Sequence, residues 1–522
     1  MDHILSIVLF TPLAGFLVLL FIPSSKPAAI KLWANIASFA SFLVCLPLIS
    51  GFDRGKDFQF VEKANWIPSI GASYHLGIDG YSLLLVALTG LLGFLSVLAS
   101  WSAIEERLKE YYGSFLLLQV GMLGVFMSLD FLLFFVFWEL VLVPMYFIIA
   151  IWGGARRVYA AIKFIIYTLV GSVLMFLGIL TLYMQHFYQT HVYTFDVIQL
   201  MSTQTPPAIQ WWIFWAFFVG FAVKVPMFPL HTWLPDAHTE APTAGSVILA
   251  SVLLKMGTYG FLRFSLPLLP DAAKDPTIVG IMAALSIVAI VYGALVSMQQ
   301  KDLKKLVAYS SVSHMGFVTL GIFASIAVLN NAQGMEGAIL VMFSHGLLTG
   351  ALFLLVGFLY ERTHTRDIAA MSRLATPLPI LAGFFMFFTL GSLGLPGLSG
   401  FVGEFLSLLG LFHYSHWLAA IAALGVILAA CYLLWMYQRV LFNDRGDDAV
   451  KPGLALTDFN SREIVSLLPL VVFVVWLGVY PTTFLNLLHL PVQQIVGRVM
   501  PSLAQAHGGA LAQLVHFTRG LF

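Results

Sequence analysis

Charged residues are scarce in this sequence. Only 10% of its 522 residues are Asp, Glu, Lys or Arg, whereas 60% are hydrophobic, and the mean hydropathy is +0.92. A soluble domain normally has about 25% charged residues, so this composition excludes a water-soluble protein and indicates a chain that lies in lipid. The apolar residues form long continuous runs and not the roughly ten-residue segments of alternating polarity that a membrane β-barrel needs, so we expect helices.

Cysteine is also rare. Cys45 and Cys431 are the only two, and both lie inside apolar runs, where a small core residue is the simplest role. A disulfide framework or a thiolate metal site is therefore not expected. The start of the chain, Met1-Asp2-His3 before an apolar run, has no basic region and no small-residue cleavage site, so we expect no removable signal.

The apolar runs predict an all-α polytopic membrane protein. A hydrocarbon core about 30 Å thick needs roughly 20 apolar residues per helix, and about fourteen such stretches fill the chain. The run at 378–412 is too long for one straight span, so we treat it as an interrupted helix. The expected spans are 4–23, 31–50, 79–101, 113–129, 131–152, 163–185, 211–234, 244–266, 277–297, 304–325, 335–360, 378–412, 416–438 and 464–487.

Lysine and arginine indicate how the chain is oriented. They are concentrated in the loops that follow the odd-numbered spans and are sparse in the alternate loops. This asymmetry persists from Arg156 to Arg462. Basic residues accumulate on the cytoplasmic side of membrane proteins. The sequence therefore predicts that both termini lie on the non-cytoplasmic side.

A few ionisable residues lie at membrane depth. A charge at the bilayer centre costs roughly 3 kcal/mol, so each one needs a reason, and such residues commonly mark ion or proton pathways. The plainer interpretation is that they are ion pairs that hold helices together or, for histidine, hydrogen-bonded core residues. We expect a proton-transfer set made of Glu139, Lys224, Lys255, His314, His345 and Glu404.

Two of the spans contain helix breakers. Pro226 and Pro229 follow directly after Lys224, and Pro396 and Gly397 precede Glu404. Proline removes a backbone donor, and irregular backbone at membrane depth must face protein or a water-filled cavity. The sequence therefore predicts a hydrated path beside each interruption.

The positions of the interruptions suggest an internal repeat. Spans 4–8 and spans 9–13 form two units of five helices, and the interrupted helix is the fourth in each. Because five is odd, the two units must have inverted topology, as in many transporters. We divide the chain into helices 1–3 (1–112), a first repeat with a proton half-channel (113–266), a second repeat (277–440), and a loop, final helix and tail (441–522).

Three stretches resemble a known family. The run from Lys224 to Gly260 (KVPMFPLHTWLPDAHTEAPTAGSVILASVLLKMGTYG) looks like the core signature of the antiporter-like subunits of complex I and of Mrp-type antiporters. The stretches 301–317 and 462–485 resemble further blocks of the same family. Glutamate at position 404, where most members carry lysine, and a chain that ends soon after the last span resemble the M-type, ND4-like subunit.

The resemblance implies a role for each buried residue. Glu139 would modulate Lys224, the central protonatable lysine, while Lys255 would bridge the two halves of the protein. His314 and His345 would relay the proton towards Glu404, the outlet group. The chain would be a proton-translocating subunit of a bacterial inner-membrane NADH:quinone oxidoreductase, a translocase with no redox cofactor of its own, since NADH, FMN, iron–sulfur clusters and quinone would belong to other subunits. Its partners would be other membrane subunits, including neighbouring antiporter-like ones, and the lipid bilayer.

Other interpretations remain open at this point. A subunit of an Mrp-type Na⁺/H⁺ antiporter or of a membrane-bound hydrogenase shares the signature, and a passive scaffold could keep the fold without pumping. A haem or metal site would have to use residues of one Pro-containing loop, which do not project from facing helices. Those residues are His231, Asp236, His238 and Glu240. The basic loops are too sparse to indicate nucleic acid binding.

Overall fold

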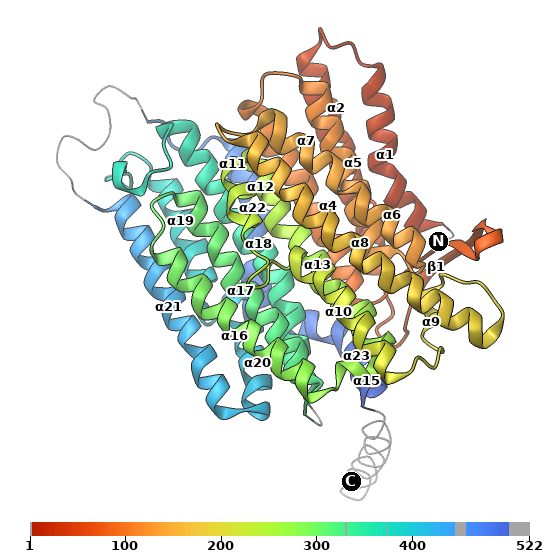
Figure 1. Ribbon diagram of the computed structural model, residues 1–522. Helices are drawn as coiled ribbons and strands as arrows, with labels where there is room; N and C mark the ends of the chain where they lie inside the picture. The colour runs from red at the N-terminus through yellow and green to blue at the C-terminus, as the bar shows by residue number, and fades with distance from the viewer. Residues whose placement is uncertain (1–2, 329–330, 372, 444–455, 501–522) are drawn as a thin grey trace, which may run out of the picture.

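The computed structural model describes residues 3–328, 331–371, 373–443 and 456–500, and helices dominate it (Figure 1). Within those ranges, 12 helices are long and apolar enough to cross a membrane. The expectation of an all-α, multi-pass membrane protein is confirmed. A helix is also present at each remaining expected position, but the helix at 108–127 and the interrupted one at 378–412 are not among the 12, so the exact number of spans stays a prediction.

The N-terminal region contains three long helical segments and one β-hairpin. The sequence predicted only a loop between residues 51 and 78, because short strands outside the membrane carry no long apolar run. The two strands pair in antiparallel fashion around a 3₁₀ turn at Pro68–Ile70. The elements are α1 (Ile4–Phe21), α2 (Pro27–Leu43), α3 (Leu46–Ser50), β1 (Gln59–Ile67), β2 (Ala72–Ile78) and α4 (Gly80–Ala103).

Carboxylates anchor the hairpin, and Asp196 contacts both of its strands. Asp196 Oδ2 lies 2.5 Å from Lys63 Nζ of β1 and 3.1 Å from His75 Nδ1 of β2. Burial alone would raise the pKa of Asp196, but the hydrogen bonds from His75 and Lys63 outweigh it and hold that pKa below its usual value. The backbone N–H of Leu129, two residues before helix α6 (Phe131–Leu140), also donates to the His75 carbonyl at 2.8 Å. The hairpin therefore fixes the point at which α6 enters the membrane.

The helices between residues 108 and 273 include the first of the two expected repeats. Two π-helical turns, Leu249–Leu253 and Phe261–Ser265, join α12, α13 and α14 into one continuous helix. A π turn is rare and often marks a functional position, and the hydrophobic pattern did not reveal these two. The helices are α5 (Leu108–Met127), α6 (Phe131–Leu140), α7 (Leu142–Trp152), α8 (Arg157–Thr190), α9 (Val197–Leu200), α10 (Pro207–Lys224), α11 (Trp233–Glu240), α12 (Thr243–Ile248), α13 (Leu254–Gly260), α14 (Leu266–Leu268) and α15 (Pro270–Ala273).

The following region holds a second set. Asp275 and Asp302 cap the first two helices by accepting hydrogen bonds from backbone N–H groups, as helix N-caps usually do. Its helices are α16 (Pro276–Met298), α17 (Leu303–Ser325), α18 (Ala332–Thr363), α19 (Pro379–Ser392), α20 (Ser399–Tyr414) and α21 (His416–Leu441), with a 3₁₀ turn at Ile368–Ala370. The inverted relation between the two sets, and the boundaries of the repeats, stay predictions.

The carboxyl end contains two helices where we expected one. The predicted span 464–487 is divided into α22 (Ser461–Val479) and α23 (Thr482–Val499). Pro481 lies between them, and its missing backbone N–H favours a helix end at this point, although α22 and α23 each also contain an internal proline. The remainder of the predicted C-terminal region, 444–455 and 501–522, lies outside the described residues.

Several elements gather at one end of the bundle, and the most enclosed helices lie in its middle. The N-terminus, the β-hairpin, α9, α15 and α23 gather at one end, which we call the terminal face (Figure 1). In the middle of the bundle, every residue in the most apolar 18-residue stretch of the continuous helix Thr243–Leu268 and of α18 is buried, and so are 94% of those in α17. Only 33% of the residues in the corresponding stretches of α1 and α21 are buried. Lys255, His314 and His345 therefore belong to the most enclosed helices of the described chain.

Candidate functional site

Lys224 occupies an enclosed position without a direct partner. It is the last residue of α10 and is only 1% exposed, and among the described residues its Nζ has no hydrogen-bond partner. The ring centroids of Trp138 and Phe164 lie 5.2 and 5.7 Å from Nζ. Such cation–π contacts stabilise an ammonium group by only about 1–2 kcal/mol. A lysine held in this way can gain or lose its proton with a small change in its surroundings.

Glu139 is the acidic group that acts on Lys224. It lies in α6, next to Trp138, and its charge interacts with that of Lys224. Its buried Oε1 also lacks a hydrogen-bond partner within the part of the chain that is described. In the described structure, no hydrogen bond or ion pair joins Glu139 to Lys224.

The helix interruption after Lys224 is stabilised by a tryptophan. The chain leaves helical geometry between Lys224 and Trp233, over the segment that holds Pro226 and Pro229. Trp233 Nε1 donates a hydrogen bond of 2.9 Å to the carbonyl of Val223, which the interruption would otherwise leave free. This contact keeps the end of α10 fixed beside Lys224.

Lys255 makes direct contact with His345. Lys255 is fully buried, between the two π turns, and its Nζ lies 2.7 Å from the carbonyl of Ala250 and 2.7 Å from His345 Nδ1. An ammonium group has only donors, so a charged Lys255 requires Nδ1 to accept. His345 is then neutral with its proton on Nε2, an atom that has no partner among the described residues.

His314 and Glu404 form the next pair. His314 Nδ1 lies 2.7 Å from Glu404 Oε1, and the hydroxyl of Tyr432, on α21, lies 3.3 Å from His314 Nε2. The ring centroids of His314 and His345 are 5.9 Å apart. In most ring orientations this distance is too long for a direct hydrogen bond between the two rings, but one water molecule could bridge them.

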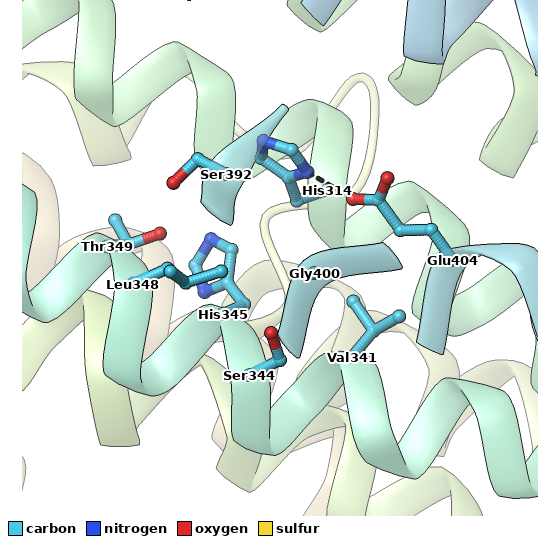
Figure 2. A pocket seen from close by; sticks show the side chains of 9 residues that line it. All are labelled: His314, Val341, Ser344, His345, Leu348, Thr349, Ser392, Gly400 and Glu404. Carbon is cyan, nitrogen blue, oxygen red and sulfur yellow. Dashed lines mark hydrogen bonds and ion pairs between the residues drawn. The ribbon is translucent and has the colours of Figure 1, made fainter. Parts of the chain in front are cut away.

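A small cavity lies between the two histidines (Figure 2). Its volume of about 10 Å³ corresponds to about one water molecule. Figure 2 shows His345 below His314, with Ser392 beside them and Glu404 on the far side of His314. The Ser392 hydroxyl has no partner within the described chain, so it and His345 Nε2 are both free to bind a water there. The remaining lining residues are Val341, Ser344, Leu348, Thr349 and Gly400.

The second helix interruption forms one wall of this cavity. α19 ends at Ser392 and α20 begins at Ser399, and the segment between them holds Pro396. Gly394 and Gly397 have φ angles of +83° and +92°, which other residues rarely adopt. Ser344 of α18 donates a 2.8 Å hydrogen bond to Ser399 and so fixes the start of α20 against the helix that carries His345.

The structure thus divides the expected residues into two groups. Lys255 contacts His345 and His314 contacts Glu404, and the water-sized cavity lies between these two contacts. In the described structure, no hydrogen bond joins Glu139 or Lys224 to these four residues. Sequence reasoning missed Tyr432, because a tyrosine in an apolar run looks like any other core aromatic residue. It also passed over Arg263, near the end of the expected span 244–266, which the structure buries to 3% exposure.

The segment considered for haem or metal is not a loop, since Asp236, His238 and Glu240 lie in α11, and its side chains do not form a convergent site. Asp236 pairs instead with Lys163 at 2.7 Å and with Arg156 at 3.3 Å. His238 stacks on Phe353, with ring centroids 4.6 Å apart. Over the residues that the structure describes, no group of three or more His, Cys, Asp or Glu side chains is placed to hold a metal ion.

Comparisons with known proteins agree with this architecture. Residues 128–429 match the family model described as "NADH:quinone oxidoreductase/Mrp antiporter, TM", and residues 7–129 match the amino terminus of NADH-ubiquinone oxidoreductase chain 4. The chain is 48% identical to the NADH-quinone oxidoreductase subunit M of Rhodobacter capsulatus, over 100% of both chains.

Solved structures show the same fold. A chain of respiratory complex I from Thermus thermophilus, solved with bound NADH, is 32% identical with a TM-score of 0.84, covering 95% of this chain and 99% of that one. A chain of the Mrp complex from Dietzia is similar in fold alone, at 22% identity and a TM-score of 0.78, over 95% of this chain and 52% of that one. The chain therefore belongs to the NADH:quinone oxidoreductase/Mrp antiporter membrane family, on the branch of subunit M and chain 4.

Proposed function

We propose that this chain is the proton-translocating M subunit of a bacterial NADH:quinone oxidoreductase and moves protons through its buried ionisable residues. The observation that carries the proposal is the connected series from Lys255 through His345 and His314 to Glu404, with its water-sized cavity. Each step lies within reach of a hydrogen bond or of one bridging water, as proton transfer requires.

The Glu139–Lys224 pair supplies the switch. When Glu139 approaches Lys224, it stabilises the ammonium form and loads a proton, and when it withdraws, the buried lysine releases that proton towards Lys255. Lys255 passes it to His345 Nδ1, and His345 releases the proton on Nε2 towards His314 and Glu404. Electron transfer takes place in other subunits, so the energy reaches this chain through its contacts with neighbouring membrane subunits.

The membrane and orientation are part of the same proposal. The chain lies in the inner membrane of a bacterium, with the terminal face away from the cytoplasm. The distribution of Lys and Arg between alternate loops supports this orientation. A protease-sensitive tag at the N-terminus, accessible only from the non-cytoplasmic side, would test it.

Proton pumping in vesicles that contain the whole complex tests the function. We expect Glu139→Gln and Lys224→Ala to abolish most of the pumping by this subunit while NADH oxidation and assembly remain measurable. Lys56→Ala is the matched control, because Lys56 is 72% exposed and pairs only with Asp53 on the terminal face. Normal pumping in both assembled variants would refute the assignment and favour a passive scaffold.

A further inference from the structure

A buried ion pair closes the terminal-face end of the Lys255 helix. Arg263 Nη2 lies 2.7 Å from Asp79 Oδ2, and both side chains are 4% exposed. The same guanidinium donates to Ser82 Oγ at 2.9 Å and to the Tyr259 hydroxyl at 3.1 Å. The ring centroid of Tyr81 lies only 4.4 Å from the Arg263 Cζ. Such a set of partners holds the guanidinium in one position.

The pair lies in line with the central lysine. Lys255, Tyr259 and Arg263 are spaced four residues apart on one continuous helix, so they share a face, and about 12 Å of helix rise separates Lys255 from Arg263. Lys255 Nζ points the other way, towards the carbonyl of Ala250 and His345. The ion pair therefore lies between Lys255 and the terminal face.

A cavity with charged, polar and apolar side chains in its walls begins where the pair ends. Its volume is about 320 Å³, room for several water molecules, and α23 forms one of its walls. Charged and polar side chains line it, including Asp57, Asp79, Arg263, Gln494 and Arg498. On this face of the helix, Tyr259 is the residue between Lys255 and Arg263, and its ring packs against Tyr81 and Phe126.

We propose that the Asp79–Arg263 pair is a plug that keeps a proton on Lys255 from leaving directly into the terminal-face cavity. This inference rests on the proposed function, in which Lys255 carries a proton. Lateral transfer to His345 is then the route left open, so the plug gives the proton its direction.

The chemistry of arginine suits a plug better than that of lysine or histidine. Arginine does not release its proton in proteins, so Arg263 cannot act as a relay. Its fixed positive charge also repels an approaching proton, as buried arginines do in pores that exclude protons and cations. The plainer alternative is an ion pair that only holds α4 against the Lys255 helix.

Removing the cation in one variant and the anion in another distinguishes a plug from an ion pair that only holds the helices together. Arg263→Met removes the fixed cation, keeps much of the side-chain length, and leaves Asp79 as a lone carboxylate that can accept a proton. Asp79→Asn keeps the cation and keeps the helix cap, since Asp79 Oδ1 accepts from Ser82 N and asparagine caps equally well. A plug predicts that only the first variant leaks, whereas a structural pair predicts that both do.

The measurement is the decay of an imposed pH gradient in vesicles that contain the assembled complex, without NADH. We expect severalfold faster decay for Arg263→Met. The helix rise of about 12 Å is the least separation of the two charges, and at an effective dielectric constant of about 20 one unit charge at that distance changes proton occupancy by at most about tenfold. Asp79→Asn should decay like wild type. Arg362→Met is the matched control, because it breaks another buried pair, with Glu463 at 2.7 Å, away from Lys255.

A second substitution links the leak to Lys255. Adding Lys255→Met to Arg263→Met should restore slow decay, and a leak that survives this change would overturn the proposal. Equal leaks from Asp79→Asn and Arg263→Met, or no leak from assembled Arg263→Met, would also overturn it. If Arg263→Met does not assemble, the neutral pair Asp79→Asn with Arg263→Gln takes its place and must leak more than wild type. The passive leak is independent of pumping, so failure of the proposed function appears separately, in Glu139→Gln and Lys224→Ala.

Discussion

Filling the cavity between His345 and His314 should stop proton transfer. Ser392→Val replaces the unpartnered hydroxyl by a methyl group and adds a second one. The cavity of about 10 Å³ has room for only about one water, so the added methyl group excludes it. With ring centroids 5.9 Å apart, the two histidines then have no bridging group. A correctly placed proton-transfer partner contributes about 10²–10⁴-fold to a rate, so this step should become too slow for turnover.

The assay is the ratio of proton translocation to NADH oxidation in vesicles with the assembled complex. Ser392→Ala is the matched control, because it removes the same hydroxyl but leaves room for the water, and its ratio should stay near that of wild type. Overpacking of about 1–3 kcal/mol is expected for Ser392→Val, so the amount of assembled complex must be measured alongside. A wild-type ratio in assembled Ser392→Val would refute the bridging water.

Two further predictions concern stability. The pKa of Asp196 is lower in the folded protein than its unfolded value of about 3.9, so its stabilisation is complete above that value and is lost as the pH falls through the folded-state pKa. Asp196→Asn should therefore destabilise the hairpin by about 1–3 kcal/mol at pH 7 but by much less at pH 2. Hydrogen exchange of the β1 and β2 backbone amides measures this difference. Equal exchange rates in the variant and the wild type at pH 7 would contradict the prediction. Gly478→Ala should destabilise the protein by about 1–3 kcal/mol, because its new Cβ would meet the carbonyl oxygen of Gly397 in the helix interruption. Gly280→Ala is the control, since nothing lies within 4 Å of a Cβ there, and a thermal midpoint for Gly478→Ala no lower than that of Gly280→Ala would count against the reasoning.

The helices and most of the candidate site residues could be predicted from the sequence for one physical reason. A single charge inside a long apolar run is expensive, so Lys224, Lys255 and Glu404 were visible as exceptions. The interruptions were visible as well, because proline and glycine change the backbone itself. Both signals are local, and they need no knowledge of which helices are neighbours.

What the sequence could not show depends on contacts between distant segments. Tyr432 lies beside His314 only because α21 packs against α17. Arg263 lies so near the end of its expected span that it resembles a loop residue. The β-hairpin was missed because Lys63 and His75 are polar residues outside the membrane, where a strand and a loop have similar composition. The π turns beside Lys255 change the backbone hydrogen bonding without any breaker residue.

The end of α10 at Lys224 also has an electrical consequence. The aligned peptide dipoles of a helix place about half a negative charge at its carboxyl end, within the last turn. By stopping at Lys224, α10 brings that negative end to an ammonium group that has no side-chain hydrogen bond in the described chain. The backbone thus supplies part of the counter-charge permanently, and in the proposed cycle Glu139 would supply only the part that changes.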